Sequence, residues 1–313
     1  MPDIVVMFFL LGLFAGLVRS DLSIPKATYD TLSLLLMLTI GLKGGMALHG
    51  NLTWALLPEL LTVVVLGALI PLTLFPLLRK VIGLNLANSA SLAAHYGSVS
   101  AGTFAVALAY TQTNNLVIDP VITLYLVLME LPAIIVGLLL YRRYSAALPN
   151  AKTVSMGELW HEALTNKGVI LLIGGVIIGF MYGPQQGAQV TDLLMGGFKA
   201  ILALFLLEMG LTAAQTLRPL PLKHWKLMVF ALVAPLCLGV IGIGVGTALG
   251  LEQGSIVILA SLTASASYIA APAAIKASIP EADIGLAMLS SLGLTFPFNV
   301  IIGIGLYHQI VQW

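Results

Sequence analysis

The chain has 313 residues, of which 59% are hydrophobic and 9% are charged, and its mean hydropathy is +1.04. A soluble domain carries about 25% charged residues, so this composition excludes an ordinary soluble protein. The net charge of +1 excludes the basic footprint of a nucleic-acid-binding protein, and the single cysteine, Cys237, excludes a disulfide or a thiolate metal cluster within one chain.

Apolar runs recur along the whole length, which predicts an all-α polytopic membrane protein. The first run has no basic region before it and Arg19 after it, so we expect a span rather than a cleaved signal peptide. Turn residues divide the chain into ten expected spans, of which the first and sixth are short: 4–19, 27–48, 53–78, 87–110, 117–141, 168–182, 190–217, 224–250, 254–277 and 282–311. The polar stretch 145–167 then links a first half, 1–144, to a second half, 168–313.

Basic residues predict the orientation of these spans. With the N-terminus outside, the cytoplasmic loops and the span ends beside them collect twelve of the fourteen lysines and arginines, and the other two, Lys43 and Lys199, fall inside spans. This asymmetry follows the positive-inside rule. We therefore expect both termini on the extracytoplasmic side and the 145–167 linker in the cytoplasm.

The two halves contain similar segments in the same order. "IGLKGGMAL" at 40–48 matches "MGLTAAQTL" at 209–217, and "LPAIIVGLLLY" at 131–141 matches "FPFNVIIGIGLY" at 296–307. Five spans per half is an odd number, so the second repeat is expected to be inverted relative to the first. Inverted repeats are typical of secondary transporters, whose substrate site lies near the midplane.

A Ser-x-Ser motif occurs once in each half, in the expected fourth and ninth spans. "SVSAGTFAVA" begins at Ser98 and "SASYIAAPAA" begins at Ser265. Small hydroxyl residues also let helices pack closely, and one such motif would favour that reading. Because the motif recurs at equivalent positions, it predicts two broken helices that cross. The N-termini of the half-helices would then attract an anion, and the free carbonyls would bind Na+.

Two carboxylates, Glu130 and Glu208, lie deep inside expected spans, and such groups are costly and often functional. Glu130 is the better candidate for a Na+ ligand, although a structural pairing with a helix end remains an alternative. Glu208 is as readily explained by pairing with Lys43 or Lys199. In the span that matches the one with Glu130, Thr295 and Asn299 supply neutral oxygens.

These motifs, together with "HYGSVSAGTFAVA" and "SLGLTFPFNVIIGIGLYH", resemble the sodium-dependent bicarbonate transporter family over essentially the whole chain. The resemblance implies a plasma-membrane symporter of ten transmembrane helices in two inverted repeats, with a core domain, a gate domain and a homotrimeric assembly. It implies that Na+, as coupling ion, drives the import of bicarbonate at the crossing of the broken helices. Around the substrate it implies Ser98, Ser100, Ala101, Gly102, Thr103, Ser265, Ser267, Tyr268 and Ile269. For Na+ we expect ligands among Ser98, Glu130, Thr263, Ser265, Thr295 and Asn299.

The alternatives are a Na+-coupled importer of another small carboxylate, similar to bile-acid symporters, and a receptor or sensor on the same fold. We expect no catalytic residue, no transition metal and no organic cofactor, since the five histidines are scattered and no phosphate loop is present. Cyanobacterial members of the family have a longer cytoplasmic linker and are inhibited by a PII-like signalling protein. The short 145–167 linker does not favour such a partner here.

Overall fold

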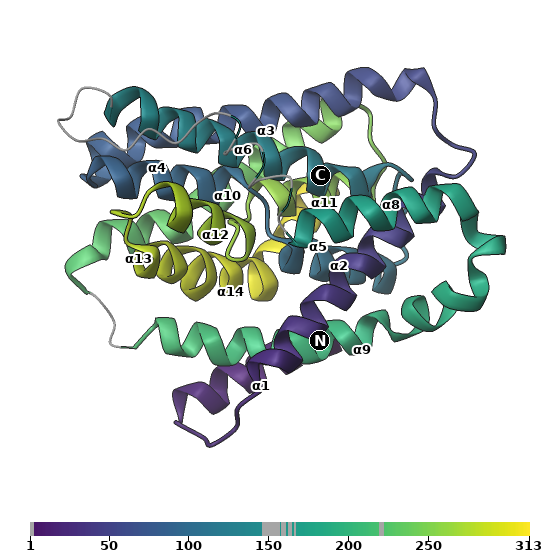
Figure 1. Cartoon of the computed structure of the whole chain (residues 1–313), viewed down its shortest axis with the longest axis horizontal. Coiled ribbons are helices and arrows are strands. Elements are labelled where there is room, and N and C mark those ends of the chain that lie inside the picture. The colour runs from purple at the N-terminus through teal and green to yellow at the C-terminus, as the bar shows by residue number, and fades with distance from the viewer. Residues whose placement is uncertain (1–2, 146–156, 158–160, 162–164, 166, 219–221) are drawn as a thin grey trace.

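The computed structural model describes residues 3–145, 157, 161, 165, 167–218 and 222–313 (Figure 1). Among these residues the regular structure is helical and no strand occurs. Eight helical segments within this described part are long and apolar enough to cross a membrane. Two further apolar helices, Ile4–Leu17 and Gln253–Thr263, are shorter. The protein is therefore an all-helical, multi-pass membrane protein, as its composition predicts.

Each of the ten expected segments is helical over most of its length. The first half contains α1 (Ile4–Leu17), α2 (Lys26–Leu48), η1 (Trp54–Leu56), α3 (Leu57–Leu77), η2 (Leu78–Ile82), α4 (Leu86–Gly97), α5 (Ala101–Thr113) and α6 (Ile122–Ser145). The second half contains α8 (Lys167–Gln186), α9 (Ala188–Thr216), η3 (Leu222–His224), α10 (Trp225–Ala248), α11 (Gln253–Thr263), α12 (Ala270–Ser278), α13 (Ile284–Met288), η4 (Leu289–Thr295), α14 (Phe296–Phe298), η5 (Asn299–Gly303) and α15 (Ile304–Val311). The fifth expected span begins later than predicted, since Asp119 and Pro120 stay outside the helix. Most of the 145–167 linker lies outside the described residues, so its predicted location is not tested.

Helices are interrupted at both Ser-x-Ser motifs, as the sequence predicts. Three residues, 98–100, separate α4 from α5, and six residues, 264–269, separate α11 from α12. Ser98 and Ser100 have extended backbone angles, and Ser100 is the N-cap residue of α5. A hydroxyl at an N-cap accepts a backbone N–H of the first turn, so these serines favour an end and a new start rather than a continuous helix.

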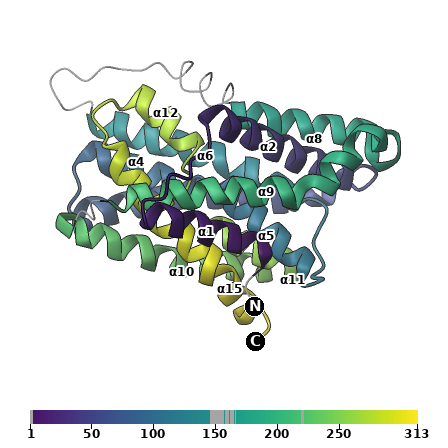
Figure 2. The same cartoon turned by 90° about the horizontal axis from the view of Figure 1, so that it is seen from below.

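The helices pack as two groups. One group consists of α1, α2, α8 and α9, in which α1 runs along α9 and α2 runs along α8 (Figure 2); we call it the four-helix group. The crossing group contains α3 to α6 and α10 to α15. Glycine allows the close approach within the four-helix group: a Cβ on Gly45 would lie 2.1 Å from the Val176 carbonyl oxygen, and one on Gly210 would lie 2.2 Å from that of Phe9.

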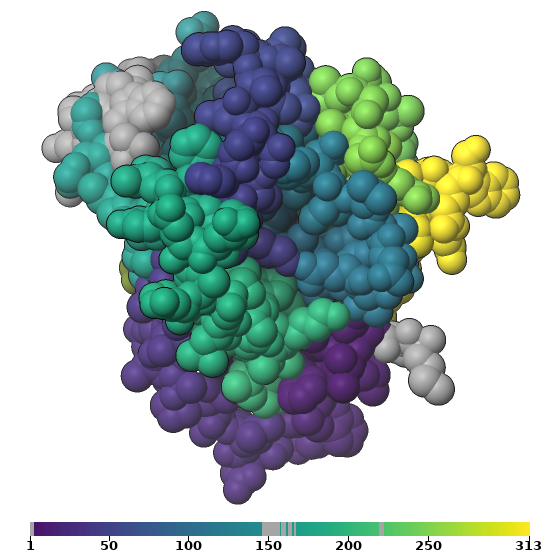
Figure 3. Space-filling model, turned by 90° about the vertical axis from the view of Figure 1, so that its right-hand side faces the viewer, coloured from purple at the N-terminus to yellow at the C-terminus, as the bar shows by residue number. Residues whose placement is uncertain are grey.

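Two opposite ends of the bundle follow from the helix directions. Along α2 and α8 the close contacts advance together, from Gly41 with Leu172 to Gly45 with Val176, so these helices are parallel. Both begin at one end, which we call the Lys167 face. α1 runs in the opposite direction, since its last residues connect to the start of α2, and its first residues therefore lie at the other end, the Asp3 face. Figure 3 looks onto this second end, where the turn between α8 and α9 lies beside the end of α5.

Candidate functional site

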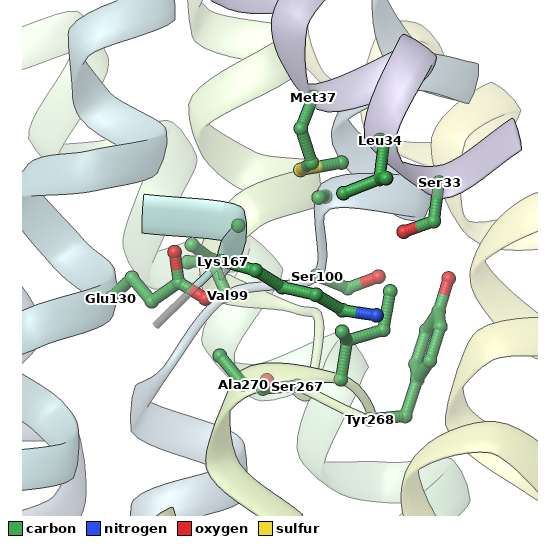
Figure 4. A pocket seen from close by; sticks show the side chains of 13 residues that line it. Ser33, Leu34, Met37, Val99, Ser100, Glu130, Lys167, Ser267, Tyr268 and Ala270 are labelled. Atoms are coloured by element: carbon green, nitrogen blue, oxygen red, sulfur yellow. The ribbon is translucent and has the colours of Figure 1, made fainter. Parts of the chain in front are cut away.

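A pocket lies between the four-helix group and the two helix breaks, on the side of the breaks that faces the Lys167 face (Figure 4). Its empty volume is about 450 Å³, including its mouth. The four-helix group contributes residues near the starts of α2 and α8, and the crossing group contributes both breaks and α6. The lining residues are Ser33, Leu34, Met37, Val99, Ser100, Ala101, Glu130, Lys167, Gly168, Ser267, Tyr268, Ile269 and Ala270.

The first break presents the start of α5 to this pocket. The Ser100 hydroxyl accepts the Thr103 N–H at 3.1 Å and so caps α5. Ala101 begins the helix and lines the pocket, and Gly102 follows against Tyr268, where an added Cβ would lie 2.0 Å from the tyrosine hydroxyl oxygen. Glycine at this position therefore lets the aromatic ring from the second break lie over the first turn of α5.

The second break presents the start of α12 in the same way. The Ser267 hydroxyl accepts the Ala271 N–H at 3.1 Å, which satisfies one donor in the first turn of α12. Tyr268 and Ile269 complete the break and line the pocket. Two helix N-termini, with their exposed N–H groups and partial positive charge, thus meet the same pocket.

The two breaks are joined by hydrogen bonds deep in the protein. Ser100 N–H donates to the Ser265 hydroxyl at 2.8 Å, and Ser267 N–H donates to the carbonyls of His95 at 2.7 Å and Ser98 at 3.0 Å. The Ser265 hydroxyl also donates to the Leu262 carbonyl at 2.8 Å. Each break therefore satisfies backbone groups that the other leaves free, which is how irregular backbone is tolerated at membrane depth.

Some buried polar atoms beside the first break have no hydrogen-bond partner among the described residues. They are the hydroxyls of Ser91, Ser98, Thr103 and Tyr268 and Nε2 of His95. His95 Nδ1 bonds the Ser91 carbonyl at 2.7 Å, which leaves Nε2 as an acceptor if Nδ1 carries the proton. Buried polar groups normally have partners, so this cluster marks a place where small polar ligands can bind.

Two charged side chains line the pocket. The Glu130 carboxylate from α6 is partly buried there and makes no ion pair with another residue that the structure describes. The Lys167 ammonium extends into the pocket toward Ser100 and Tyr268 (Figure 4) and lies 3.0 Å from Asp30 on α2. The sequence did not indicate that Lys167, Asp30 or Ser33 belongs to the site, because only the packing of α2 against α8 brings them to the breaks.

Three of the residues expected as Na+ ligands lie away from the pocket and have other partners. The Thr263 hydroxyl bonds carbonyls of its own helix, at 2.9 Å from Ala260 and 3.1 Å from Leu259. Thr295 donates to the Ala231 carbonyl and bonds the Tyr96 hydroxyl, both at 2.7 Å.

Asn299 is the third of these residues. Its amide donates to the Ala264 carbonyl at 2.8 Å, where α11 ends, and its oxygen accepts from Tyr307 at 2.9 Å. The structure thus places Ser100, Ala101, Glu130, Ser267, Tyr268 and Ile269 at the pocket and Ser98, Gly102, Thr103 and Ser265 just behind it.

The pocket offers groups of the kind that can hold a small ion. Within the described part of the chain, no group of three or more His, Cys, Asp or Glu side chains could hold a metal ion. The donors present are helix N-termini, hydroxyls and one ammonium, and the acceptors are hydroxyls, carbonyls and one carboxylate. A multi-pass helical protein with such a pocket between two interrupted helices belongs to the class of membrane transporters.

Comparison with known families agrees with this class. The family model of the Na+-dependent bicarbonate transporter superfamily matches residues 4–312, so the chain belongs to this superfamily. The resemblance seen in the sequence motifs is thereby confirmed. No curated protein matches the chain in the search made for such relatives.

Proposed function

We propose that the protein is a Na+-coupled symporter that imports bicarbonate through the plasma membrane by alternating access. The observation that carries this proposal is the pair of interrupted helices, hydrogen-bonded to each other at the inner end of one pocket. Membership of the superfamily supports Na+ and bicarbonate as the transported ions.

Bicarbonate fits the donors at the breaks. It is small, planar and singly charged, so a few N–H and hydroxyl donors are sufficient to hold it without an arginine. The N-termini of α5 and α12 each carry roughly half a positive charge. In this proposal Ser100 and Ser267 keep those N-termini in place by capping them, while Ala101, Gly102, Tyr268 and Ile269 shape the cavity.

Sodium fits the oxygen atoms beside the first break. The Ser98 hydroxyl is buried without a partner among the described residues, the Thr103 hydroxyl is in the same state, and Glu130 supplies a carboxylate at the pocket. A bound Na+ adds a full positive charge near the anion, so each ion lowers the cost of desolvating the other. The two ions should therefore bind cooperatively. Thr263, Thr295 and Asn299 act in this arrangement through the hydrogen bonds that keep the crossing in shape.

Alternating access requires two bodies that move relative to one another. In this proposal the four-helix group is the gate and the crossing group is the core, with the pocket between them. The reciprocal packing of the two halves supports an inverted repeat: α1 packs on α9 as α2 packs on α8, and α3 packs on α4 as α10 packs on α11.

We further propose that the gate forms the homotrimer, because one domain must stay fixed. We also propose that both termini lie on the extracytoplasmic side of the membrane.

The decisive experiment is the uptake of labelled bicarbonate into proteoliposomes with and without an inward Na+ gradient. We expect uptake that requires Na+ and that Ser267→Val abolishes, while the size-exclusion profile of the variant stays that of the parent. Equal uptake without Na+ would overturn the coupling. Preferred uptake of another small carboxylate would reassign the substrate, and saturable binding without uptake would indicate a receptor.

A further inference from the structure

Asp3 and Lys199 hold Thr113 between them at the Asp3 face, opposite the pocket. The Thr113 hydroxyl lies 2.8 Å from Asp3 Oδ2 and 3.1 Å from the Lys199 ammonium. Thr113 is the last residue of α5, whereas Asp3 precedes α1 and Lys199 lies on α9. These hydrogen bonds therefore connect the crossing group to the four-helix group.

Several other polar links between described residues lie within one group. The bonds between Ser100 and Ser265, between Tyr96 and Thr295, and between Asn299 and Ala264 lie inside the crossing group. The ion pair of Lys167 with Asp30 lies inside the four-helix group. A rigid movement of one group past the other preserves all of these links and breaks the contacts of Thr113.

The chemistry of the contact suits a reversible connection. The Thr113 hydroxyl has one proton, which it donates either to Asp3 or to the Ala109 carbonyl of its own helix at 2.9 Å. The Asp3 carboxylate is a stronger acceptor than a carbonyl oxygen. The Lys199 ammonium donates to the Thr113 hydroxyl oxygen and so adds a second charge-assisted bond. When the contact breaks, the hydroxyl keeps a partner on α5 and Asp3 keeps its bond to Val5 N–H at 3.0 Å, while Lys199 is exposed to solvent.

We propose that Asp3, Lys199 and Thr113 form a latch, and that these positioning residues hold the two groups in the state whose pocket opens toward the Lys167 face. Release of the latch permits the movement that opens the ion site toward the Asp3 face. The proposal rests on the proposed alternating access between the two groups. It concerns residues remote from the ions, which act on the transport cycle and not on binding.

The first test locks the latch. In a Cys237→Ala background, the pair Asp3→Cys and Thr113→Cys is oxidised to a disulfide, and Na+-dependent bicarbonate uptake is measured before and after reduction. We expect the oxidised protein to lose uptake and reduction to restore it. The matched control is His49→Cys with Phe180→Cys, two neighbouring residues of the four-helix group, whose oxidation should leave uptake unchanged. Equal uptake by the oxidised and reduced Asp3–Thr113 pair would overturn the latch.

The second test does not need a transported substrate. In the same Cys237→Ala background, Met37→Cys places a thiol in the pocket, and its rate of labelling by a maleimide reports how often the pocket is open. Exposed charge-assisted contacts of this kind are weak, so we expect Thr113→Val to shift the equilibrium between the states about two- to fivefold and to slow labelling accordingly. Thr113→Ser keeps the hydroxyl and should label like the parent. Equal labelling rates for Thr113→Val and the parent would refute the latch, even if the protein carries no bicarbonate. If the parent took up no bicarbonate but Thr113→Val still slowed labelling, only the proposed function would be refuted.

Discussion

The two helix breaks have the same Ser-x-Ser motif but use its first serine differently. In both breaks the second serine, Ser100 or Ser267, caps the helix that follows. The first serine of the second break, Ser265, donates to Leu262 and accepts from Ser100. Its counterpart Ser98 has a buried hydroxyl with no partner among the described residues.

The same difference occurs at a second pair of positions. The alignment of 131–141 with 296–307 pairs Glu130 with Thr295. Thr295 is fully buried and bonded to Tyr96 and Ala231, whereas Glu130 lines the pocket without an ion pair to a described residue. The comparison teaches that, at these two pairs of positions, the second half supplies structural contacts at the crossing that Ser98 and Glu130 in the first half do not make.

The largest effect should follow Ser265→Ala. The change removes the acceptor of a buried backbone N–H, which costs about 1–3 kcal/mol when the donor stays unsatisfied. We expect a lower melting temperature in detergent and loss of Na+-dependent uptake. Ser261→Ala, on the preceding helix α11, removes a hydroxyl that bonds only its own helix and serves as the control. A Ser265→Ala protein as stable as this control would remove the distinction between the two breaks.

Thr295→Val should have the next largest effect. Valine keeps the shape but leaves the Tyr96 hydroxyl and the Ala231 carbonyl without their shared partner, again a loss of about 1–3 kcal/mol. We expect reduced thermal stability with an unchanged Na+ requirement in the molecules that remain folded. If Thr295→Val instead raised the Na+ concentration for half-maximal uptake at full stability, Thr295 would be a Na+ ligand and the comparison would fail at this position.

Glu130→Gln should change function and leave stability nearly unchanged. Removing the negative charge weakens the attraction for Na+, and we expect the Na+ concentration for half-maximal uptake to rise about tenfold, which corresponds to about 1.4 kcal/mol of binding free energy. The measurement is uptake against Na+ concentration, with maximal uptake as the internal reference. Glu208→Gln, a change on α9 away from the pocket residues, is the matched control. Equal Na+ dependence for both variants would exclude Glu130 from the ion site.

Ser98→Ala should have the smallest effect and should sharpen the contrast with Ser265. Its hydroxyl bonds no described residue, so its loss should change the free energy of unfolding by no more than about 0.5 kcal/mol, the range of neutral substitutions. The melting temperature should therefore stay close to that of the parent. Because Ser98 is one of the neutral Na+ ligands proposed above, its loss should still raise the half-maximal Na+ concentration a few fold. Ser290→Ala, which removes a buried hydroxyl bonded within its own helix, should leave that concentration unchanged. A large loss of stability in Ser98→Ala would mean that both first serines are structural.

The sequence predicted the interruption of the helices because the determinants of a break are local. A serine hydroxyl that accepts a backbone N–H of the next helix, three residues later at Ser100 and four residues later at Ser267, competes with the continuous helix. The recurrence of the motif in both halves indicated the breaks, and with them Ser100 and Ser267, without knowledge of their neighbours. It could not distinguish Ser98 from Ser265, since both are serines in the same motif and differ only in what packs against them.

The sequence by itself therefore determined the class of the protein, its apolar helices, the two breaks and the family. These follow from composition, from spacing along the chain and from motifs that need no partner. Only the tertiary structure decided which oxygen atoms are free, which residues of α2 and α8 enclose the pocket, and that Thr113 meets Asp3 and Lys199. The physical reason is that a hydroxyl, carboxylate or ammonium binds whichever group lies within about 3 Å of it. For residues far apart in the chain, 86 positions for Thr113 and Lys199 and 199 for Tyr96 and Thr295, only the packing of the helices sets that distance.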